Sequence, residues 1–173
     1  CGKDDKTANR MDLLLFVTKG IATVATLLHN AGIESSMKVN HYDRRPILHD
    51  HKCQLDIESI TGRIIKGLKL RNELIAIAKK RDIVLPIIDE LIWNGEENSL
   101  KEIADSRRAP GSKRRHPLAE RTDHYGLKGM AAYVEHAANL GYEEPELYRF
   151  IQRALADTLR KDLTAEQLTA LVL

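Results

Sequence analysis

Residues 19–34 read KGIATVATLLHNAGIE, and residues 128–143 read KGMAAYVEHAANLGYE. Aligned without a gap, at an offset of 109 residues, the two stretches are identical at six positions: Lys19/Lys128, Gly20/Gly129, Ala22/Ala131, Asn30/Asn139, Gly32/Gly141 and Glu34/Glu143. An internal repeat indicates that one structural unit is used more than once. The repeat therefore predicts two similar halves, each led by a long helix.

The glycines of the repeat indicate how these two helices end and pack. Gly32 and Gly141 lie where a helix C-terminal cap adopts a left-handed conformation that favours glycine. Gly20 and Gly129 lie inside the helical pattern, where glycine costs about 1 kcal/mol relative to alanine. The same cost at the same place in both copies predicts that another backbone passes close to each of these two glycines. Chance similarity of two amphipathic helices is the alternative.

Apolar residues at three- and four-residue spacing predict an all-α fold. We expect long helices over residues 7–31, 56–80, 121–140 and 144–161. The predicted inward side chains of the first are Met11, Leu14, Leu15, Thr18, Ile21, Ala22, Ala25 and Leu28, and those of the second are Ile57, Ile60, Ile64, Leu68, Ile75 and Ala78. The inward side chains of the fourth are expected to be Leu147, Ile151, Ala154, Leu155 and Leu159.

Shorter helices are marked by their end signals. Pro86 at a first helical position and Gly95 at the end predict a short helix whose buried side carries Ile87, Ile88, Leu91 and Ile92. A last helix is expected to begin at Thr164, where Gln167 completes a capping box.

The repeat and these helices predict two tandem three-helix bundles. The first bundle, with a short extra helix, is assigned to residues 1–105, a basic linker loop to residues 106–120, and the second bundle, truncated at its C-terminal end, to residues 121–173. The chain begins at a cysteine and stops inside an apolar helical pattern. We therefore expect it to be a piece of a larger polypeptide.

Composition narrows the class of protein. No apolar run reaches the roughly 18–20 residues of a membrane-spanning helix, and no signal-peptide pattern is present, so no membrane partner is expected. Two cysteines make no disulfide framework, which favours a cytoplasmic location. Residues 106–117, SRRAPGSKRRHP, carry five basic residues without aromatic side chains for base stacking. A solvated loop is therefore favoured over a nucleic-acid interface.

Cys1 is the first candidate for chemistry. It precedes a predicted helix and lies beside Lys3, and both features stabilise a thiolate of the kind that binds a metal or an iron–sulfur cluster. A cubane cluster takes four thiolates, however, and this chain has only Cys1 and Cys53.

Two further groups of polar residues are weaker candidates. His49, His51 and Cys53 alternate within the loop from His41 to Cys53, so an extended backbone would place them on one face as zinc ligands. Structural zinc sites usually draw ligands from two elements, which favours a polar surface loop instead. Glu135-His136 lies on a predicted helix, but no activated nucleophile accompanies it. The residues alone therefore predict a helical scaffold without a complete active site.

Several motifs together resemble a known family. They are Cys1-Gly2-Lys3, Ala8-x-x-x-Asp12-Leu13-Leu14, Lys19-Gly20-Ile21, Asp56, Ile60, Gly62, Leu70-Arg71, Leu74, and Tyr125 to Tyr133 with Glu135-His136-Ala137. This set is similar to the N-terminal part of the hybrid-cluster proteins, the hydroxylamine reductase (prismane) family, and more distantly to the carbon monoxide dehydrogenases. The segment from His49 to Gln54, together with Pro46, departs from the family pattern, which leaves the second helix of the first bundle open.

The resemblance implies a fold and cofactors. The family's N-terminal domain consists of two three-helix bundles, and four cysteines near its start hold an iron–sulfur cluster, which is either a cubane-type 4Fe-4S or a 2Fe-2S cluster. The last of these cysteines precedes Gly-Lys, so the resemblance implies that Cys1 is a cofactor-binding metal ligand. The hybrid Fe–S–O cluster is bound by later domains, so no catalytic residue is assigned to this chain.

The function implied is that of the N-terminal helical domain, or a fragment of it, of an oxidoreductase that reduces hydroxylamine or nitric oxide. Its expected partners are the remaining domains of the same polypeptide and an electron-donating redox protein. The alternative is a free-standing α-helical interaction or scaffold protein without a cofactor, and a nucleic-acid binder is a third, weaker possibility.

Overall fold

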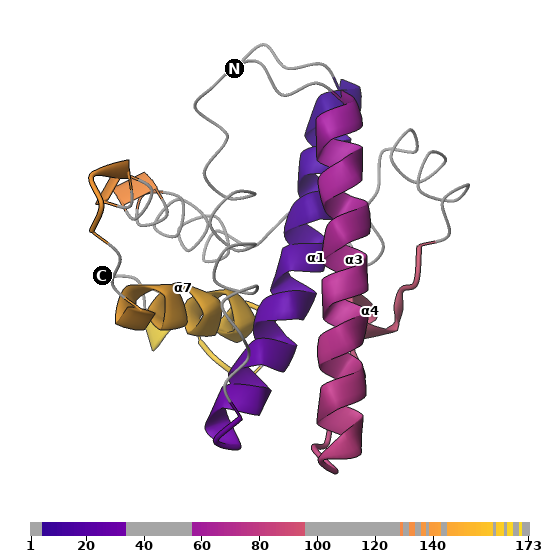
Figure 1. The fold of residues 1–173 in the computed structure, drawn as a ribbon, viewed down its shortest axis with the longest axis vertical. Helices are drawn as coiled ribbons and strands as arrows, with labels where there is room; N and C mark the ends of the chain where they lie inside the picture. Colours follow the sequence, from indigo (N-terminus) through magenta and orange to yellow (C-terminus); the bar gives the residue numbers. More distant parts are fainter. Residues whose placement is uncertain are drawn as a thin grey trace.

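The computed structural model describes four helices and several shorter stretches. The described residues are 5–33, 57–95, 129, 132, 133, 136, 137, 139–142, 145–160, 162–164, 166, 167 and 170. The helices are α1 (Asp5–Asn30), α3 (Ile57–Lys80), α4 (Asp89–Ile92) and α7 (Pro145–Asp157) (Figure 1). No strand occurs among these residues, which confirms the all-α prediction for this part of the chain. The tandem bundles and the domain boundaries stay predictions, because residues 34–56 and 96–128 lie outside the described residues.

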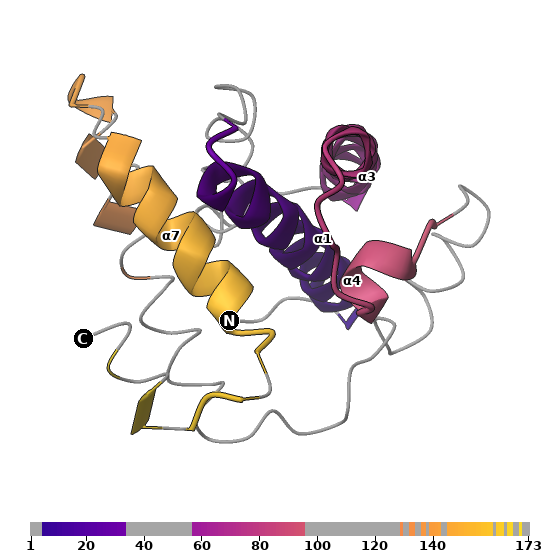
Figure 2. The same cartoon turned by 90° about the horizontal axis from the view of Figure 1, so that it is seen from below.

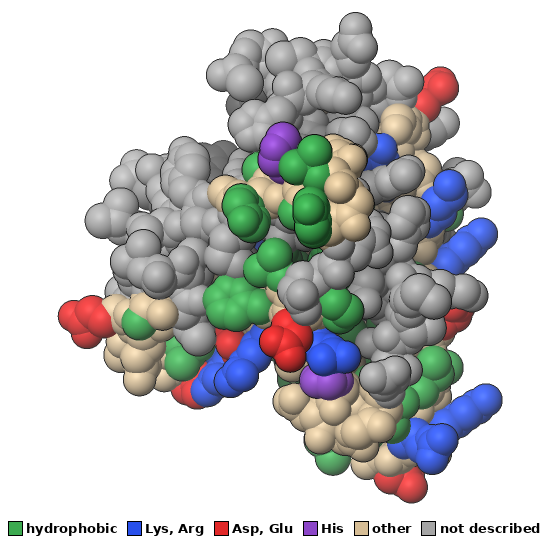
Figure 3. All heavy atoms as spheres, turned by 60° about the vertical axis from the view of Figure 1, so that its left-hand side comes forward, with side chains coloured by type: hydrophobic (Ala, Val, Ile, Leu, Met, Phe, Trp, Pro, Cys, Tyr) green, Lys and Arg blue, Asp and Glu red, His purple; other side chains and the backbone are tan. Residues whose placement is uncertain are grey.

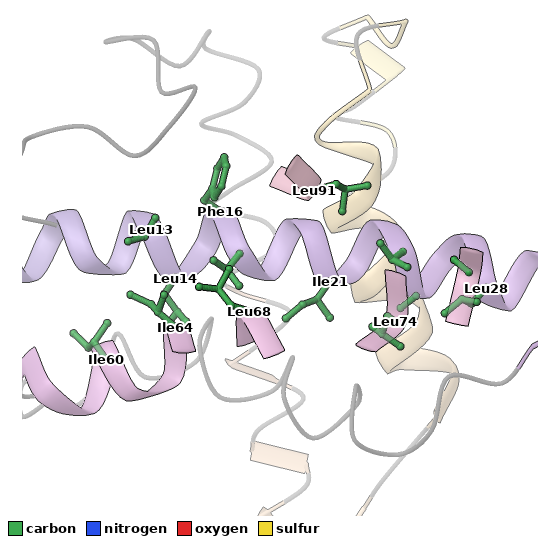
Figure 4. Packing of buried hydrophobic residues seen from close by; sticks show 14 residues of the cluster. Leu13, Leu14, Phe16, Ile21, Leu28, Ile60, Ile64, Leu68, Leu74 and Leu91 are labelled. Atoms are coloured by element: carbon green, nitrogen blue, oxygen red, sulfur yellow. The ribbon is translucent and has the colours of Figure 1, made fainter. Parts of the chain in front are cut away.

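Helix α1 lies at the centre of the described fold. It runs beside α3, with α4 on that same side, and α7 crosses it on the opposite side (Figures 1 and 2). The α1–α3–α4 side holds the larger apolar cluster, which includes Leu13, Val17, Ile21, Leu28, Ile60, Ile64, Leu74 and Leu91 (Figure 4). On the other side, Ala22 packs with Tyr148, Ile151, Ala154 and Leu155 of α7. A single helix therefore contributes to both cores.

Packing on two sides explains the composition of α1. Six of the predicted inward residues are buried, while Met11 and Leu15 are partly buried against the two clusters. Four further hydrophobic residues are also buried: Leu13, Phe16, Val17 and Val24. Residues Lys6–Asn30, which the sequence reading did not count as a possible span, are long and apolar enough to cross a membrane by length and composition alone, yet 61% of their most apolar 18-residue window is buried inside the protein. A helix covered on two sides needs apolar residues around most of its circumference.

Helices α3 and α7 begin close to where the sequence predicted. In α3 the predicted residues Ile60, Ile64, Leu68 and Ala78 are buried, and Ile57 and Ile75 are partly buried. In α7, which starts at Pro145, the residues Ile151, Ala154 and Leu155 are buried and Leu147 is partly buried, while Leu159, also partly buried, lies just after the helix ends at Asp157. These two apolar stripes confirm the periodicity argument.

The short helix from Pro86 to Gly95 was predicted wrongly. Residues 83–88 have no helical structure, and α4 contains only Asp89–Ile92. Leu91 is buried and Ile88 partly buried, as expected, but Ile87 is 90% exposed and Ile92 59% exposed. Proline disfavours the helical conformation of the residue before it. In the run Ile83–Ile88, the side chains of Ile83, Leu85 and Ile88 are partly buried and those of Val84, Pro86 and Ile87 are exposed.

The helix ends repeat one geometry. Gly32 and Gly141 have φ of 73° and 83°, which confirms the predicted left-handed caps. The Ile33 amide donates to the Leu28 carbonyl at 2.9 Å, and at the same 109-residue offset the Tyr142 amide donates to the Ala137 carbonyl at 2.9 Å. This bond closes a Schellman cap. The two copies of the repeat therefore end alike.

The capping box before the last helix is also present. The Thr164 amide donates to Gln167 Oε1 at 2.9 Å, and the Gln167 amide donates to Thr164 Oγ1 at 3.2 Å. This reciprocal pair satisfies two amides at a helix start, as the sequence predicted.

A non-glycine residue caps α3 with the same geometry. Asp82 has φ of 54°, and the Ile83 amide donates to the Ala78 carbonyl at 3.0 Å. The left-handed conformation costs a residue with a side chain about 1 kcal/mol, and a carboxylate at a helix C-terminus also opposes the helix dipole. Asp82→Gly is therefore expected to raise the free energy of unfolding by roughly 0.5–1 kcal/mol.

Urea unfolding measures this change. Gly32→Ala makes the reverse change, because it adds a side chain at a residue with φ of 73°. It should lower the free energy of unfolding by about 1 kcal/mol. A less stable Asp82→Gly variant would show that the carboxylate makes a favourable interaction that outweighs the backbone strain.

Candidate functional site

Arg71 is the centre of the most elaborate buried polar group. It lies in the middle of α3 and is 0% exposed. Its Nη1 donates to the Glu90 carbonyl at 2.8 Å, and its Nη2 donates to Asn94 Oδ1 at 3.0 Å. Nε and Nη2 also donate to Asn72 Oδ1, at 3.3 and 3.0 Å. The planar guanidinium thus joins α3 to both ends of the α4 turn.

The hydrogen-bond acceptors that the structure describes around the Arg71 guanidinium are all neutral. Its partners are one backbone carbonyl and two side-chain amides, and the described part of the chain places no carboxylate in an ion pair with it. Burial lowers the pKa of the Arg71 guanidinium from its usual value, because desolvation penalises the charged form. Hydrogen bonds that involve a charged group are stronger than neutral ones. They offset this desolvation and hold α4 in place.

Gly20 completes this junction from the side of α1. A Cβ atom added at Gly20 would lie 2.5 Å from the Glu90 oxygen and 3.2 Å from Arg71 Cδ. The predicted close approach of another backbone is therefore confirmed at Gly20. It is wrong at Gly129, which is exposed and has no described atom within 4 Å of an added Cβ. The arrangement of Gly20, Arg71, Glu90 and Asn94 is called the Arg71 junction below.

A second polar group lies at the end of α7. Arg160 donates to both carboxylate oxygens of Asp162, at 3.1 and 2.6 Å, and also to Asp157 at 3.5 Å. The hydrogen bond from Arg160 lowers the pKa of Asp162. Arg160 and Asp162 are exposed to solvent, so this pair has the character of a surface ion pair that contributes little to stability.

The residues predicted to carry chemistry are mostly not among those described. Cys1, the loop from His41 to Cys53 and the basic residues of 106–117 all lie outside the described residues. His136 is described and lies exposed on a helix. Across the described residues, no group of three or more His, Cys, Asp or Glu side chains is placed to hold a metal ion.

Sequence reasoning missed the role of Arg71, although a signal was present. Arg71 follows Leu68 by three residues and Ile64 by seven, so it occupies a core position of the apolar stripe of α3. A charged residue at such a position predicts burial with hydrogen-bond partners. The partners themselves, Glu90 and Asn94, carry no comparable signal because they belong to an irregular segment.

Comparison with known proteins extends over the whole chain. The family model described as "Prismane/CO dehydrogenase family" matches residues 1–173. A protein named hydroxylamine reductase from Bacteroides thetaiotaomicron is 40% identical over 176 residues, which cover 100% of this chain and 31% of that protein. Hydroxylamine reductases from Porphyromonas gingivalis and Clostridium botulinum are 38% and 31% identical, again over 100% of this chain and over 32% and 35% of their own lengths. The chain thus spans about a third of the length of these relatives.

Proposed function

Because the chain belongs to the Prismane/CO dehydrogenase family, we propose that it is the helical domain, or a fragment of it, of a hybrid-cluster oxidoreductase. The proposed reaction is the reduction of hydroxylamine or nitric oxide, with electrons from a separate redox protein in the cytoplasm. The main support for this proposal is the family match along the entire chain, together with relatives that are about three times as long. The catalytic cluster is assigned to the part of the polypeptide outside these residues.

The number of cysteine ligands in the chain supports the assignment of the catalytic cluster to another part of the polypeptide. An iron–sulfur cluster takes thiolate ligands, usually four, and the chain has only Cys1 and Cys53. The chain by itself therefore does not fit a complete cluster. In this proposal Cys1 is one ligand of the family's N-terminal iron–sulfur cluster (cubane-type 4Fe-4S, or 2Fe-2S), and the remaining ligands come from elsewhere in the polypeptide.

The tandem arrangement forms part of the same proposal. The six identities at a constant offset of 109 residues support two bundles related by an internal repeat, and both stretches end in a Schellman bond, at Ile33 and at Tyr142. What the proposal requires of this chain is a rigid scaffold, and the doubly covered helix α1 supplies one.

The function is tested on the full-length polypeptide that contains this chain, purified without oxygen. We expect it to reduce hydroxylamine with a reduced dye as electron donor and to contain iron and acid-labile sulfide. The 173-residue chain, treated with iron and sulfide in parallel, should give neither activity nor a stable charge-transfer absorbance. Hydroxylamine reduction by the 173-residue chain alone, or a full-length polypeptide without iron, would contradict the proposal.

The assignment of Cys1 has its own test in the full-length polypeptide. Cys1→Ser should lower the iron content and remove the electron paramagnetic resonance signal of the reduced cubane-type cluster. Cys53→Ser is the matched control, since it also removes one thiol, and should leave both unchanged. Equal effects of the two substitutions would argue against a specific role for Cys1.

A further inference from the structure

The segment between α3 and α4 exposes an unusual amount of apolar surface. Val84 is 88% exposed and Ile87 90%, with Pro86 between them also exposed, and Ile92 of α4 is 59% exposed. These four side chains are named the 84–92 strip. It lies on the opposite side of α1 from α7 (Figure 2). Side chains this large and apolar usually mark an interaction site when they gather on one surface.

The strip is held in a fixed position. Ile83, Leu85 and Ile88, which lie in the same segment as its members, pack against the core cluster, as does Trp93, which meets the ring of Phe16 edge-on with centroids 6.0 Å apart. In the Arg71 junction, hydrogen bonds from Arg71 to Glu90 and Asn94 hold the α4 turn in place. A fixed backbone presents the strip in one geometry, which favours binding to a folded surface.

The sequence of this segment is apolar toward both sides. Residues 83–88 read IVLPII, with no polar residue on the outward face. A segment that buries only one face alternates apolar with polar residues, whereas a continuous apolar run is typical of a segment covered on both faces. Charged residues border the strip at Lys80 and Arg81 before it and at Asp89 within it. An apolar centre with a polar rim is the composition of a protein interface.

Apolar side chains on the α7 side are arranged differently. Tyr133, Leu140, Tyr142 and Phe150 are exposed there, and Figure 3 shows apolar side chains on that side mixed with charged ones.

We propose that the 84–92 strip is the docking surface for the remainder of the same polypeptide. This inference rests on the proposed function, because the relatives are about three times as long as this chain and their remaining two thirds must pack somewhere. A second copy that added a strand to this segment would need its backbone N–H groups, and Pro86 has none. Contact through side chains with a folded domain suits the strip better.

Photochemical footprinting with peptide-level mass spectrometry tests the proposal on native side chains. The peptide that contains Val84 and Ile87 should be modified several-fold less in the full-length polypeptide than in the 173-residue chain. Equal modification in the two forms overturns the proposal. Low modification in the 173-residue chain that increases on dilution also overturns it, because a second copy would then cover the strip.

A double substitution gives an independent readout. Val84→Ser with Ile87→Ser should leave the melting temperature of the 173-residue chain nearly unchanged, since both side chains are exposed there, and should lower that of the full-length polypeptide. Lys69→Ser with Glu73→Ser, at two exposed polar positions of α3, is the matched control. An unchanged melting temperature of the full-length double variant overturns the docking proposal.

Hydroxylamine reduction, measured on the same full-length sample, separates the two proposals. Protection of the strip without activity contradicts the proposed function and leaves the docking surface supported. Activity without protection contradicts the docking surface alone.

Discussion

Replacing Arg71 with alanine should lower the free energy of unfolding by about 2–4 kcal/mol. The substitution removes the donors to the Glu90 carbonyl and to Asn94 Oδ1. Hydrogen bonds to charged groups contribute about 1.5–3 kcal/mol each, and the relief of burying a charge offsets part of their loss. Urea unfolding measures the total change, and hydrogen exchange of the Leu91 and Trp93 amides, which close the α4 turn, measures the local one.

Two comparisons make this experiment specific. Lys66→Ala removes an exposed cation from the same helix and should change stability by less than about 0.5 kcal/mol. Arg71→Met keeps most of the side-chain volume but none of the donors, so it should remain destabilised and should expose the α4 amides to exchange. A fully stable Arg71→Met variant would mean that Arg71 acts by packing alone.

Replacing Gly20 with alanine should lower the free energy of unfolding by about 1–3 kcal/mol, although alanine is the better helix former. The added methyl group would meet the Glu90 oxygen at 2.5 Å. That oxygen belongs to the backbone and accepts a hydrogen bond from Arg71, so α4 as a whole must move to make room. Overpacking of this kind outweighs the gain of up to about 1 kcal/mol in helix propensity.

Two other glycines serve as controls, because alanine should change the free energy of unfolding in the opposite direction there. Gly62 in α3 and Gly129 have no described atom within 4 Å of an added Cβ. Alanine at either position should therefore raise stability, by up to about 1 kcal/mol. Thermal melts of the three alanine variants measure these changes in stability. A stabilised Gly20→Ala variant would contradict the close approach of α4.

The periodic parts of the fold were predictable from the sequence and the irregular part was not. The 3.6-residue pattern located α1, α3 and α7, glycine located the end of α1, and the Thr164–Gln167 pair located the start of the last predicted helix, because these signals are local. The segment from Ile83 to Ile92 was misassigned, because a continuous apolar run fits a helix and an extended segment equally well. Its conformation depends on tertiary contacts with Arg71 and with the core, which local patterns do not contain.

Of the candidate site, too, only a part was predictable from the sequence. Arg71 could have been identified, since a cation within an apolar stripe is visible in the sequence. The close approach at Gly20 was inferred correctly, but the extension to Gly129 relied on sequence similarity, and similar helices in two halves need not meet the same neighbours. Cys1 rests on the family resemblance and stays a prediction.

The sharing of α1 between two apolar clusters has a consequence for cooperativity. Ile21 packs toward α3 while its neighbour Ala22 packs toward α7, so melting this turn of α1 opens both cores together. Regions that share such an element gain or lose their structure as one unit. The described helices α3 and α7 are therefore not independent folding units, and α7 depends for its stability on a helix that precedes it by more than a hundred residues.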